Sequence, residues 1–202
     1  MSLFKRLFGK KEKVQEAAPV VVSAELLKVH ELDVLMKDLL SGNHYVARSE
    51  YTDALSGYND LLPWFKVLKD SGTFEVFCSN NGTTAEEVSG VLKRLNSFST
   101  LIDYQNEQFI KAKLVSEKEY LDGVLKESDP NILLDDDQRR VVLTDEDYCL
   151  VVAGAGAGKT TTVAAKVKYL VDKQGIDPKQ ILVISFTNNV YTARFERSAR
   201  SF

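Results

Sequence analysis

An alternation of small residues ending in a Lys-Thr pair, AGAGAGKT at Ala153 to Thr160, limits the possible folds of this chain more than any other feature. The β-rich hexapeptide YCLVVA comes before it, and a helix-type pattern of apolar residues follows it. Glycines let backbone N–H groups turn inward with no Cβ in the way, and the first turn of the next helix adds further donors. We therefore predict a phosphate-binding loop at a strand-to-helix junction.

Each polar group of this loop has an expected role. Lys159 would reach the β- and γ-phosphates as a point charge, and the Thr160 hydroxyl would hold Mg²⁺, so we expect ATP and Mg²⁺ as cofactors and these two residues as catalytic. The strict pattern begins with glycine where this chain has Ala153, but the loop acts through its backbone, and no donor is lost. The alternative is a glycine-rich turn that binds nothing. The predicted nucleotide-binding residues are Ala153, Gly154, Ala155, Gly156, Ala157, Gly158, Lys159, Thr160 and Thr161.

Composition places the chain among ordinary globular proteins and excludes several classes. Hydrophobic residues make up 44% and charged residues 27%, and 26 basic against 29 acidic residues give a net charge of -3. That balance argues against coating nucleic acid through bulk charge, although it allows a local basic groove. Two distant cysteines and the absence of a secretory signal predict a reducing, cytoplasmic location. His30 and His44 have no ligand-spaced neighbours, so we predict no histidine metal site.

The first 22 residues are expected to form a basic amphipathic tail and a linker. Residues 1–13, MSLFKRLFGKKEK, place apolar side chains at helical spacing among lysines and arginine. Such a segment could contact an anionic membrane surface, or it could be a solvated terminus.

Apolar residues at helical spacing predict a helical, coiled-coil-like domain over residues 23–130. A first helix is expected over 23–40, with Ser23 as its cap. A second apolar stripe runs over 46–68, where Pro63 should kink or interrupt the helix.

The third helical stretch is predicted to be long. Residues 71–82 are expected to form a loop, and a capping box of Thr83 with Glu86, or of Thr84 with Glu87, would start the next helix. The stripe continues to Lys126 without a strong stop, which favours one long helix or two collinear ones.

The character of the sequence changes after Pro130, and residues 131–202 are predicted to form a separate α/β domain. Residues 148–153 and 181–186 are expected to be buried parallel strands on either side of a helix over 160–172. The predicted fold class is thus α/β, with an all-helical region followed by an incomplete parallel-sheet domain. We interpret the two acidic runs, Asp135 to Asp137 and Asp145 to Asp147, as solvated turns.

Three blocks resemble the opening of a superfamily 1 DNA helicase of the UvrD and Rep type. The blocks are LLDDDQRRVV, VVAGAGAGKTTT and ILVISFTNN, and the branch that includes DNA helicase IV is the most similar. The resemblance implies a P-loop domain of the RecA-like kind. It implies that Gln138, 21 residues before Lys159, selects adenine, and that Arg139 or Arg140 lies against the base or its phosphates. Single-stranded or partly duplex DNA would be the partner of an intact relative, with contacts at Phe186, Thr187 and Asn188.

The same resemblance indicates what this sequence lacks. Hydrolysis in that family needs an acidic DExx motif and later arginines, whereas this sequence ends 43 residues after Lys159 with NNVYTARFERSARSF. We therefore expect the ATP-binding N-terminal portion of an ATP-dependent helicase or translocase, inactive alone and encoded by a truncated or frame-shifted gene. One alternative is a helical interaction module whose protein partner completes the nucleotide site. A small P-loop kinase or transferase is another, although it would leave Gln138 without a purpose.

Overall fold

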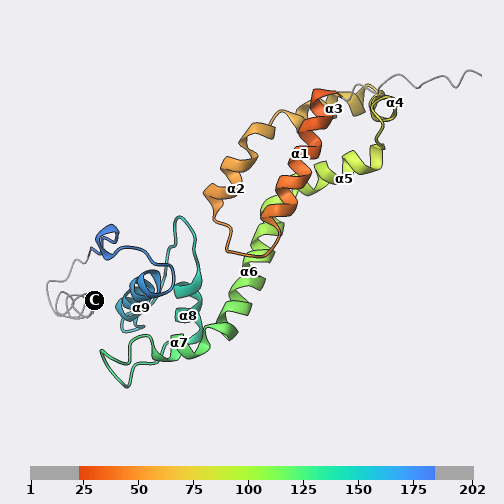
Figure 1. The fold of residues 1–202 in the computed structure, drawn as a ribbon. Coiled ribbons are helices and arrows are strands. Elements are labelled where there is room, and N and C mark those ends of the chain that lie inside the picture. Colours follow the sequence, from red (N-terminus) through yellow and green to blue (C-terminus); the bar gives the residue numbers. More distant parts are fainter. Residues whose placement is uncertain (1–22, 185–202) are drawn as a thin grey trace, which may run out of the picture. The chain divides into compact units, whose positions relative to one another are not determined.

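The structure, a computed structural model, describes residues 23–184, and the regular elements in this range are all helices (Figure 1). The chain divides into two compact units. The elements in chain order are α1 (Ala24–Leu39), α2 (Arg48–Leu55), η1 (Ser56–Tyr58), α3 (Leu61–Asp70), α4 (Phe74–Asn80), α5 (Ala85–Asn96), α6 (Phe98–Ser116), α7 (Lys118–Gly123), α8 (Asp136–Leu143), α9 (Lys159–Asp172) and η2 (Pro178–Gln180).

The predicted parallel-sheet domain is wrong for the described part of the chain, because residues 23–184 contain no β-strand. Residues 148–152 and 181–184 take no regular structure, and their apolar side chains face solvent: Tyr148 is 94% exposed, Leu150 89% and Leu182 82%. A strand forms only when a neighbouring strand takes up its N–H and C=O groups, and these two segments do not pair with each other. The β-propensity of these two segments was therefore not enough to predict strands.

The first unit includes residues 23–34 and 58–96 of the described chain. Its centre is aromatic: the ring centroid of Phe65 lies 5.7 Å from that of Phe74, edge to face, and Trp64 meets Phe77 in the same way at 5.0 Å. Phe74 and Cys78, one helical turn apart, are both buried. This burial explains why α4 forms where a loop was predicted, since one apolar face is enough to dock a short helix.

Local caps in the first unit agree with the sequence. The Ser23 hydroxyl accepts the Leu26 N–H at 3.3 Å, as expected for the start of α1. Of the two possible capping boxes the structure has Thr84 with Glu87, because the Glu87 N–H donates to the Thr84 hydroxyl at 3.1 Å and the Thr84 N–H to the Glu87 carboxylate at 3.0 Å. These bonds satisfy N–H groups that a helix start leaves open.

The long helix expected up to Lys126 is interrupted. Ser97, between α5 and α6, has φ −108° and ψ 13°, and Glu117, between α6 and α7, has φ −99° and ψ 11°. Both conformations lie outside the helical region. An apolar stripe cannot reveal such breaks, since the same spacing continues on the next helix.

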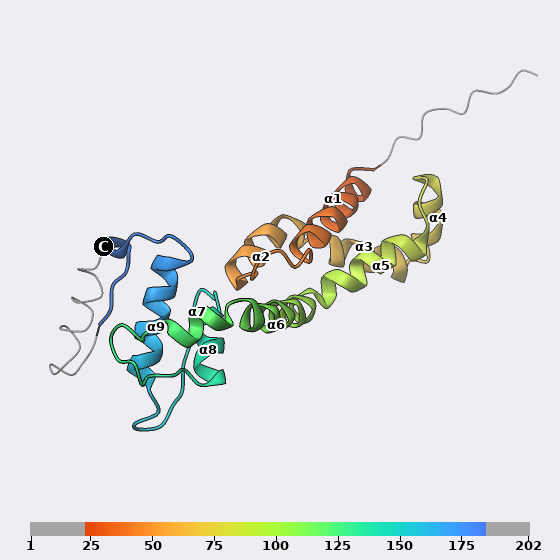
Figure 2. The same cartoon turned by 60° about the horizontal axis from the view of Figure 1, so that its bottom comes forward.

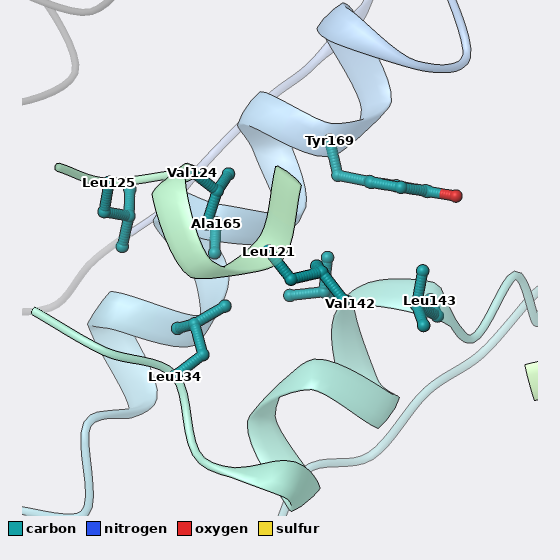
Figure 3. Packing of buried hydrophobic residues seen from close by; sticks show 8 residues of the cluster. All are labelled: Leu121, Val124, Leu125, Leu134, Val142, Leu143, Ala165 and Tyr169. Atoms are coloured by element: carbon teal, nitrogen blue, oxygen red, sulfur yellow. The ribbon is translucent and has the colours of Figure 1, made fainter. Parts of the chain in front are cut away.

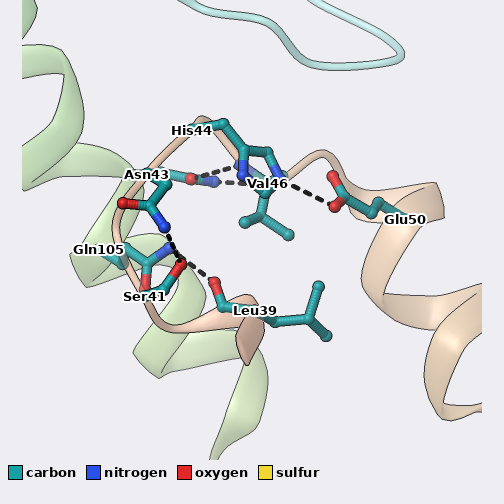
Figure 4. A network of polar contacts seen from close by, with 8 residues as sticks. Leu39, Ser41, Asn43, His44, Val46, Glu50 and Gln105 are labelled. Carbon is teal, nitrogen blue, oxygen red and sulfur yellow. Dashed lines mark hydrogen bonds and ion pairs between the residues drawn. The ribbon is translucent and has the colours of Figure 1, made fainter. Parts of the chain in front are cut away.

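The second unit includes residues 35–57 and 97–184 of the described chain. Two buried amides on α6 hold the connection between α1 and α2. The Asn106 side chain accepts the Val46 N–H at 2.9 Å and donates to the Val46 carbonyl at 2.8 Å. Its neighbour Gln105 donates to the Leu39 carbonyl at 2.8 Å, at the end of α1 (Figure 4).

A hydrophobic cluster joins α7, α8 and α9 within this unit (Figure 3). Helices α8 and α9 lie side by side in both views (Figure 1, Figure 2). The Lys166 ammonium of α9 donates to the Val142 and Thr144 carbonyls at 3.0 and 2.6 Å, which satisfies the C-terminal end of α8. Burial lowers the pKa of Lys166. The buried residues of the hydrophobic cluster between α7, α8 and α9 are Leu121, Val124, Leu125, Leu134, Val142, Leu143, Ala165 and Tyr169.

This cluster draws residues from both sides of Pro130, where the sequence suggested a boundary. The predicted division into residues 1–22, 23–130 and 131–202 stays a prediction. No helix among the described residues is long and apolar enough to cross a membrane.

Candidate functional site

The glycine-rich run forms an irregular loop that leads directly into α9. Gly156 has φ 78° and Gly158 has φ 73°, both in the left-handed region where a Cβ would be strained. Gly158 is the N-cap of α9, and its carbonyl accepts the Thr162 N–H at 2.9 Å. The turn into the helix thus depends on glycine at these two positions. Thr160 and Thr161 lie in the first turn of α9, half-buried.

The Lys159 side chain folds back over its own loop. Its ammonium donates to the Ala153 carbonyl at 2.9 Å and to the Gly154 carbonyl at 2.7 Å. The Gly154 carbonyl also accepts the Ala157 N–H at 3.3 Å. The loop is therefore closed by bonds among its own groups.

The structure brings Gln138 to this loop from α8. Its backbone N–H donates to the Asp135 carboxylate at 2.8 Å, and its Oε1 accepts the Asp135 N–H at 3.1 Å, which completes a capping box. Its Nε2 donates to the Ala157 carbonyl at 3.2 Å. A Cβ built on Gly158 would lie 2.5 Å from that nitrogen, so the amide packs directly against the loop. The resemblance to UvrD and Rep helicases brought Gln138 to attention, and its role toward a base stays a prediction.

The two arginines after Gln138 bind carboxylates rather than the loop. Arg140 forms an ion pair with Glu107 of α6, and this pairing lowers the pKa of Glu107. Arg139 pairs with Asp122 of α7 at 2.7 Å and also donates to the Leu134 carbonyl at 2.8 Å. Their expected position against a nucleotide stays a prediction, and in this structure both guanidinium groups connect helices of the second unit.

The first acidic run is exposed to solvent, as predicted, but its interpretation as a turn is wrong. Asp135 is the N-cap of α8, and Asp136 and Asp137 occupy its first turn, where negative charge complements the helix dipole. Asp135 and Gln138 are three residues apart, which is the spacing of a capping box. This signal was present in the sequence, but the run of acidic residues was interpreted as a turn.

The second acidic run also caps a helix, one that lies about a hundred residues earlier in the chain. Glu146 Oε1 accepts the Arg48 N–H at 2.9 Å, and Asp147 accepts the Ser49 N–H and hydroxyl, each at 2.7 Å. The Tyr45 hydroxyl also donates to Glu146, at 3.4 Å. No local sequence pattern reveals caps of this kind, because the donors and acceptors belong to distant segments.

Other predicted site residues have no structural test. Phe186, Thr187 and Asn188, expected to contact DNA, lie outside the described residues, as does the segment 1–13. Within residues 23–184 there is no group of three or more histidine, cysteine or acidic side chains that could hold a metal ion. Thr160 stays the predicted Mg²⁺ ligand.

Comparison with known proteins shows what the loop segment resembles. Residues 134–196 match the UvrD/REP helicase N-terminal domain. This segment is similar to UvrD/Rep helicases. A probable DNA helicase II homolog from Mycoplasma capricolum is 43% identical over 65 residues, which are 32% of this chain and 9% of that protein. The ATP-dependent DNA helicase UvrD1 of Mycobacterium leprae is 42% identical over 67 residues, 33% of this chain and 9% of the relative. A PcrA helicase of Staphylococcus epidermidis is 40% identical over 55 residues, 27% of this chain and 8% of the relative.

The similarity to UvrD and Rep helicases thus covers only part of this chain and only part of each relative. The chain spans about a tenth of the length of these curated relatives, and the alignments cover between 27% and 33% of the chain. No solved structure matches the chain. The expected resemblance to UvrD and Rep helicases is confirmed for this segment, whereas the narrower placement beside DNA helicase IV stays a prediction.

Proposed function

We propose that this chain is the ATP-binding portion of a UvrD-type, ATP-dependent DNA helicase or translocase. The observation that carries the proposal is the glycine loop at the start of α9, with Lys159 inside it and Gln138 against it. The relatives named above are DNA helicases, two of them named as ATP-dependent, which supports ATP and DNA as ligands of the intact protein.

The loop can bind a polyphosphate through groups that the chain already places together. The N–H groups of the first turn of α9 carry the positive end of the helix dipole, and Lys159 adds a full charge. To reach phosphate, the Lys159 ammonium exchanges the Ala153 and Gly154 carbonyls for phosphate oxygens. That exchange is favourable because a charged pair is a stronger hydrogen bond than one to a neutral carbonyl. Thr160 is the proposed Mg²⁺ ligand, and Gln138 is proposed to read the adenine edge.

Binding rather than turnover is the expected behaviour of the 202-residue chain by itself. The described residues offer no cluster of carboxylates that could complete a Mg²⁺ site. We further propose the cytoplasm as the location, DNA contacts at Phe186, Thr187 and Asn188, and a protein partner for the helical region.

The direct test is isothermal titration of the chain with ATP and Mg²⁺. The variant Lys159→Ala should weaken binding about tenfold or more, since hydrogen bonds to charged groups contribute about 1.5–3 kcal/mol. Lys28→Ala is the matched control, because that lysine lies in the first unit and pairs there with the exposed Asp60 at 2.9 Å. Equal ATP affinity in the wild type and in Lys159→Ala would reject the proposal. ATP turnover stimulated by single-stranded DNA and lost in Lys159→Ala would show that the chain is active alone.

A further inference from the structure

A hollow of about 350 Å³ lies between α3 and α5 in the first unit and is open to solvent. Its floor is apolar, because Phe65 of α3 and Leu92 of α5 line it and are both buried. Leu62 also lines the hollow and has 38% of its surface exposed. Side chains of another molecule that fill this space would remove apolar surface from water, which favours binding.

Three lysines surround this α3–α5 hollow. Lys66 and Lys69 lie one turn apart on α3, and Lys93 lies on α5; all three are exposed. The Lys69 ammonium also lies 5.1 Å from the centroid of the Phe74 ring, an attraction that holds this side chain against the unit. Like charges around one hollow repel one another, so a negatively charged partner is attracted to it.

Two of these charges are not neutralised by the described part of the protein. Within residues 23–184, neither Lys66 nor Lys69 forms an ion pair. By contrast, Lys28, which lies elsewhere in the first unit, is paired with Asp60 at 2.9 Å. The positive charge that can attract a partner is therefore concentrated at the α3–α5 hollow.

We propose that the α3–α5 hollow binds an amphipathic helix with acidic flanks, carried by a protein partner. Apolar side chains one turn apart on that helix fill the space beside Leu62, and carboxylates on its flank pair with Lys66 and Lys69. Such helix-in-groove recognition uses contacts from residues three and four apart. The inference deepens the proposed protein partner of the helical region, and it does not depend on the ATP site.

The α3–α5 hollow fits a protein helix better than a nucleic-acid strand. Proteins that bind single strands without sequence preference stack the bases on aromatic rings, but the ring of Phe65 is only 1% exposed. Asp70 lines the same hollow, and its carboxylate repels a backbone that carries a charge at every phosphate. A helix can place its few carboxylates beside the lysines and away from Asp70.

The test is fluorescence anisotropy of a labelled helical peptide titrated with the whole chain. The designed peptide has leucines on one face and glutamates flanking them, and a scrambled peptide of the same composition has no apolar face. Lys66→Gln should weaken binding of the designed peptide about two- to fivefold, which corresponds to one exposed ion pair. Lys28→Gln is the matched control, since it removes an equal charge from the same unit but away from the hollow.

Each outcome decides the proposal. Saturable binding of the designed peptide that is weaker in Lys66→Gln than in Lys28→Gln, and weaker for the scrambled peptide, supports it. No binding to wild type, equal binding of both peptides, or equal affinity of the two variants overturns it. A single-stranded oligothymidine that outcompetes the designed peptide and binds less tightly to Lys66→Gln also overturns it and assigns the hollow to nucleic acid. ATP affinity is measured separately, so the hollow and the ATP site can fail independently.

Discussion

Replacing Asn106 by leucine should clearly destabilise the second unit. The Asn106 side chain is 6% exposed and holds both backbone groups of Val46, which is itself fully buried. Leucine fills a similar volume but strands the Val46 N–H and C=O away from water. A stranded buried group costs about 1–3 kcal/mol. With two such groups and some relaxation of the connection between α1 and α2, we expect a loss of about 2–4 kcal/mol.

The adjacent residue offers an internal comparison. Gln105 donates one bond, to the Leu39 carbonyl, and its Oε1 is buried without a hydrogen-bond partner among the described residues. In Gln105→Leu the cost of stranding the Leu39 carbonyl is offset by removing this unsatisfied oxygen, which carries a penalty of the same size, about 1–3 kcal/mol. The expected net change is within about 1 kcal/mol of zero.

Urea denaturation followed by circular dichroism gives the free energy of unfolding of both variants. Equal m-values would show that each variant exposes the same surface on unfolding as the wild type. The expected result is a clear fall in the unfolding midpoint for Asn106→Leu and almost none for Gln105→Leu. If Gln105→Leu were the more damaging of the two, or if both were neutral, the assignment of the Asn106 amide as the main polar support of this unit would be refuted.

Two further predictions concern pH. The pKa of Asp147 lies below its usual 3.8 because the Ser49 hydroxyl and N–H donate to it, so its stabilisation is present above that pH and is lost as the pH falls through the lowered pKa. Asp147→Asn should therefore lower the thermal midpoint at about pH 7, and the difference from wild type should shrink as the pH falls below 3.8; a constant difference would contradict this cause. Burial, and then the charge of Glu146, raises the pKa of Tyr45 to about 12. The stabilisation from the neutral Tyr45 side chain is complete below about pH 10 and is lost as the pH rises toward 12. Wild type should therefore lose stability relative to Tyr45→Phe above about pH 10, as measured by urea midpoints. Parallel pH curves for the two proteins would contradict this prediction.

Local signals in the sequence were reliable where the structure they encode is also local. The cap at Ser23 and the capping box of Thr84 and Glu87 each need only residues within one helical turn. The helix after the glycine loop likewise follows from a pattern inside a single segment, and it appears as α9. The acidic run at Asp135 carried the same kind of signal, which went unrecognised because the acidic residues suggested a turn.

Sequence patterns whose structure depends on distant parts of the chain were not interpreted correctly. The apolar runs at 148–153 and 181–186 have strand composition, but in the described residues no neighbouring strand takes up their backbone groups. The roles of Glu146 and Asp147 depend on α2, nearly a hundred residues away, and no pattern within the loop could have disclosed them.

The sequence by itself determined the chemistry that this chain can offer: glycines where the backbone must take a left-handed conformation, a lysine and a threonine at the start of a helix, and a likeness to UvrD/Rep helicases. These properties depend on residue types at fixed short spacings. Only the tertiary structure decided which groups hold one another: Gln138 against Ala157, Lys159 on the carbonyls of its own loop, and both arginines in ion pairs. A polar side chain binds whichever complementary group the folded chain brings within hydrogen-bonding distance, and that proximity is a property of the packing.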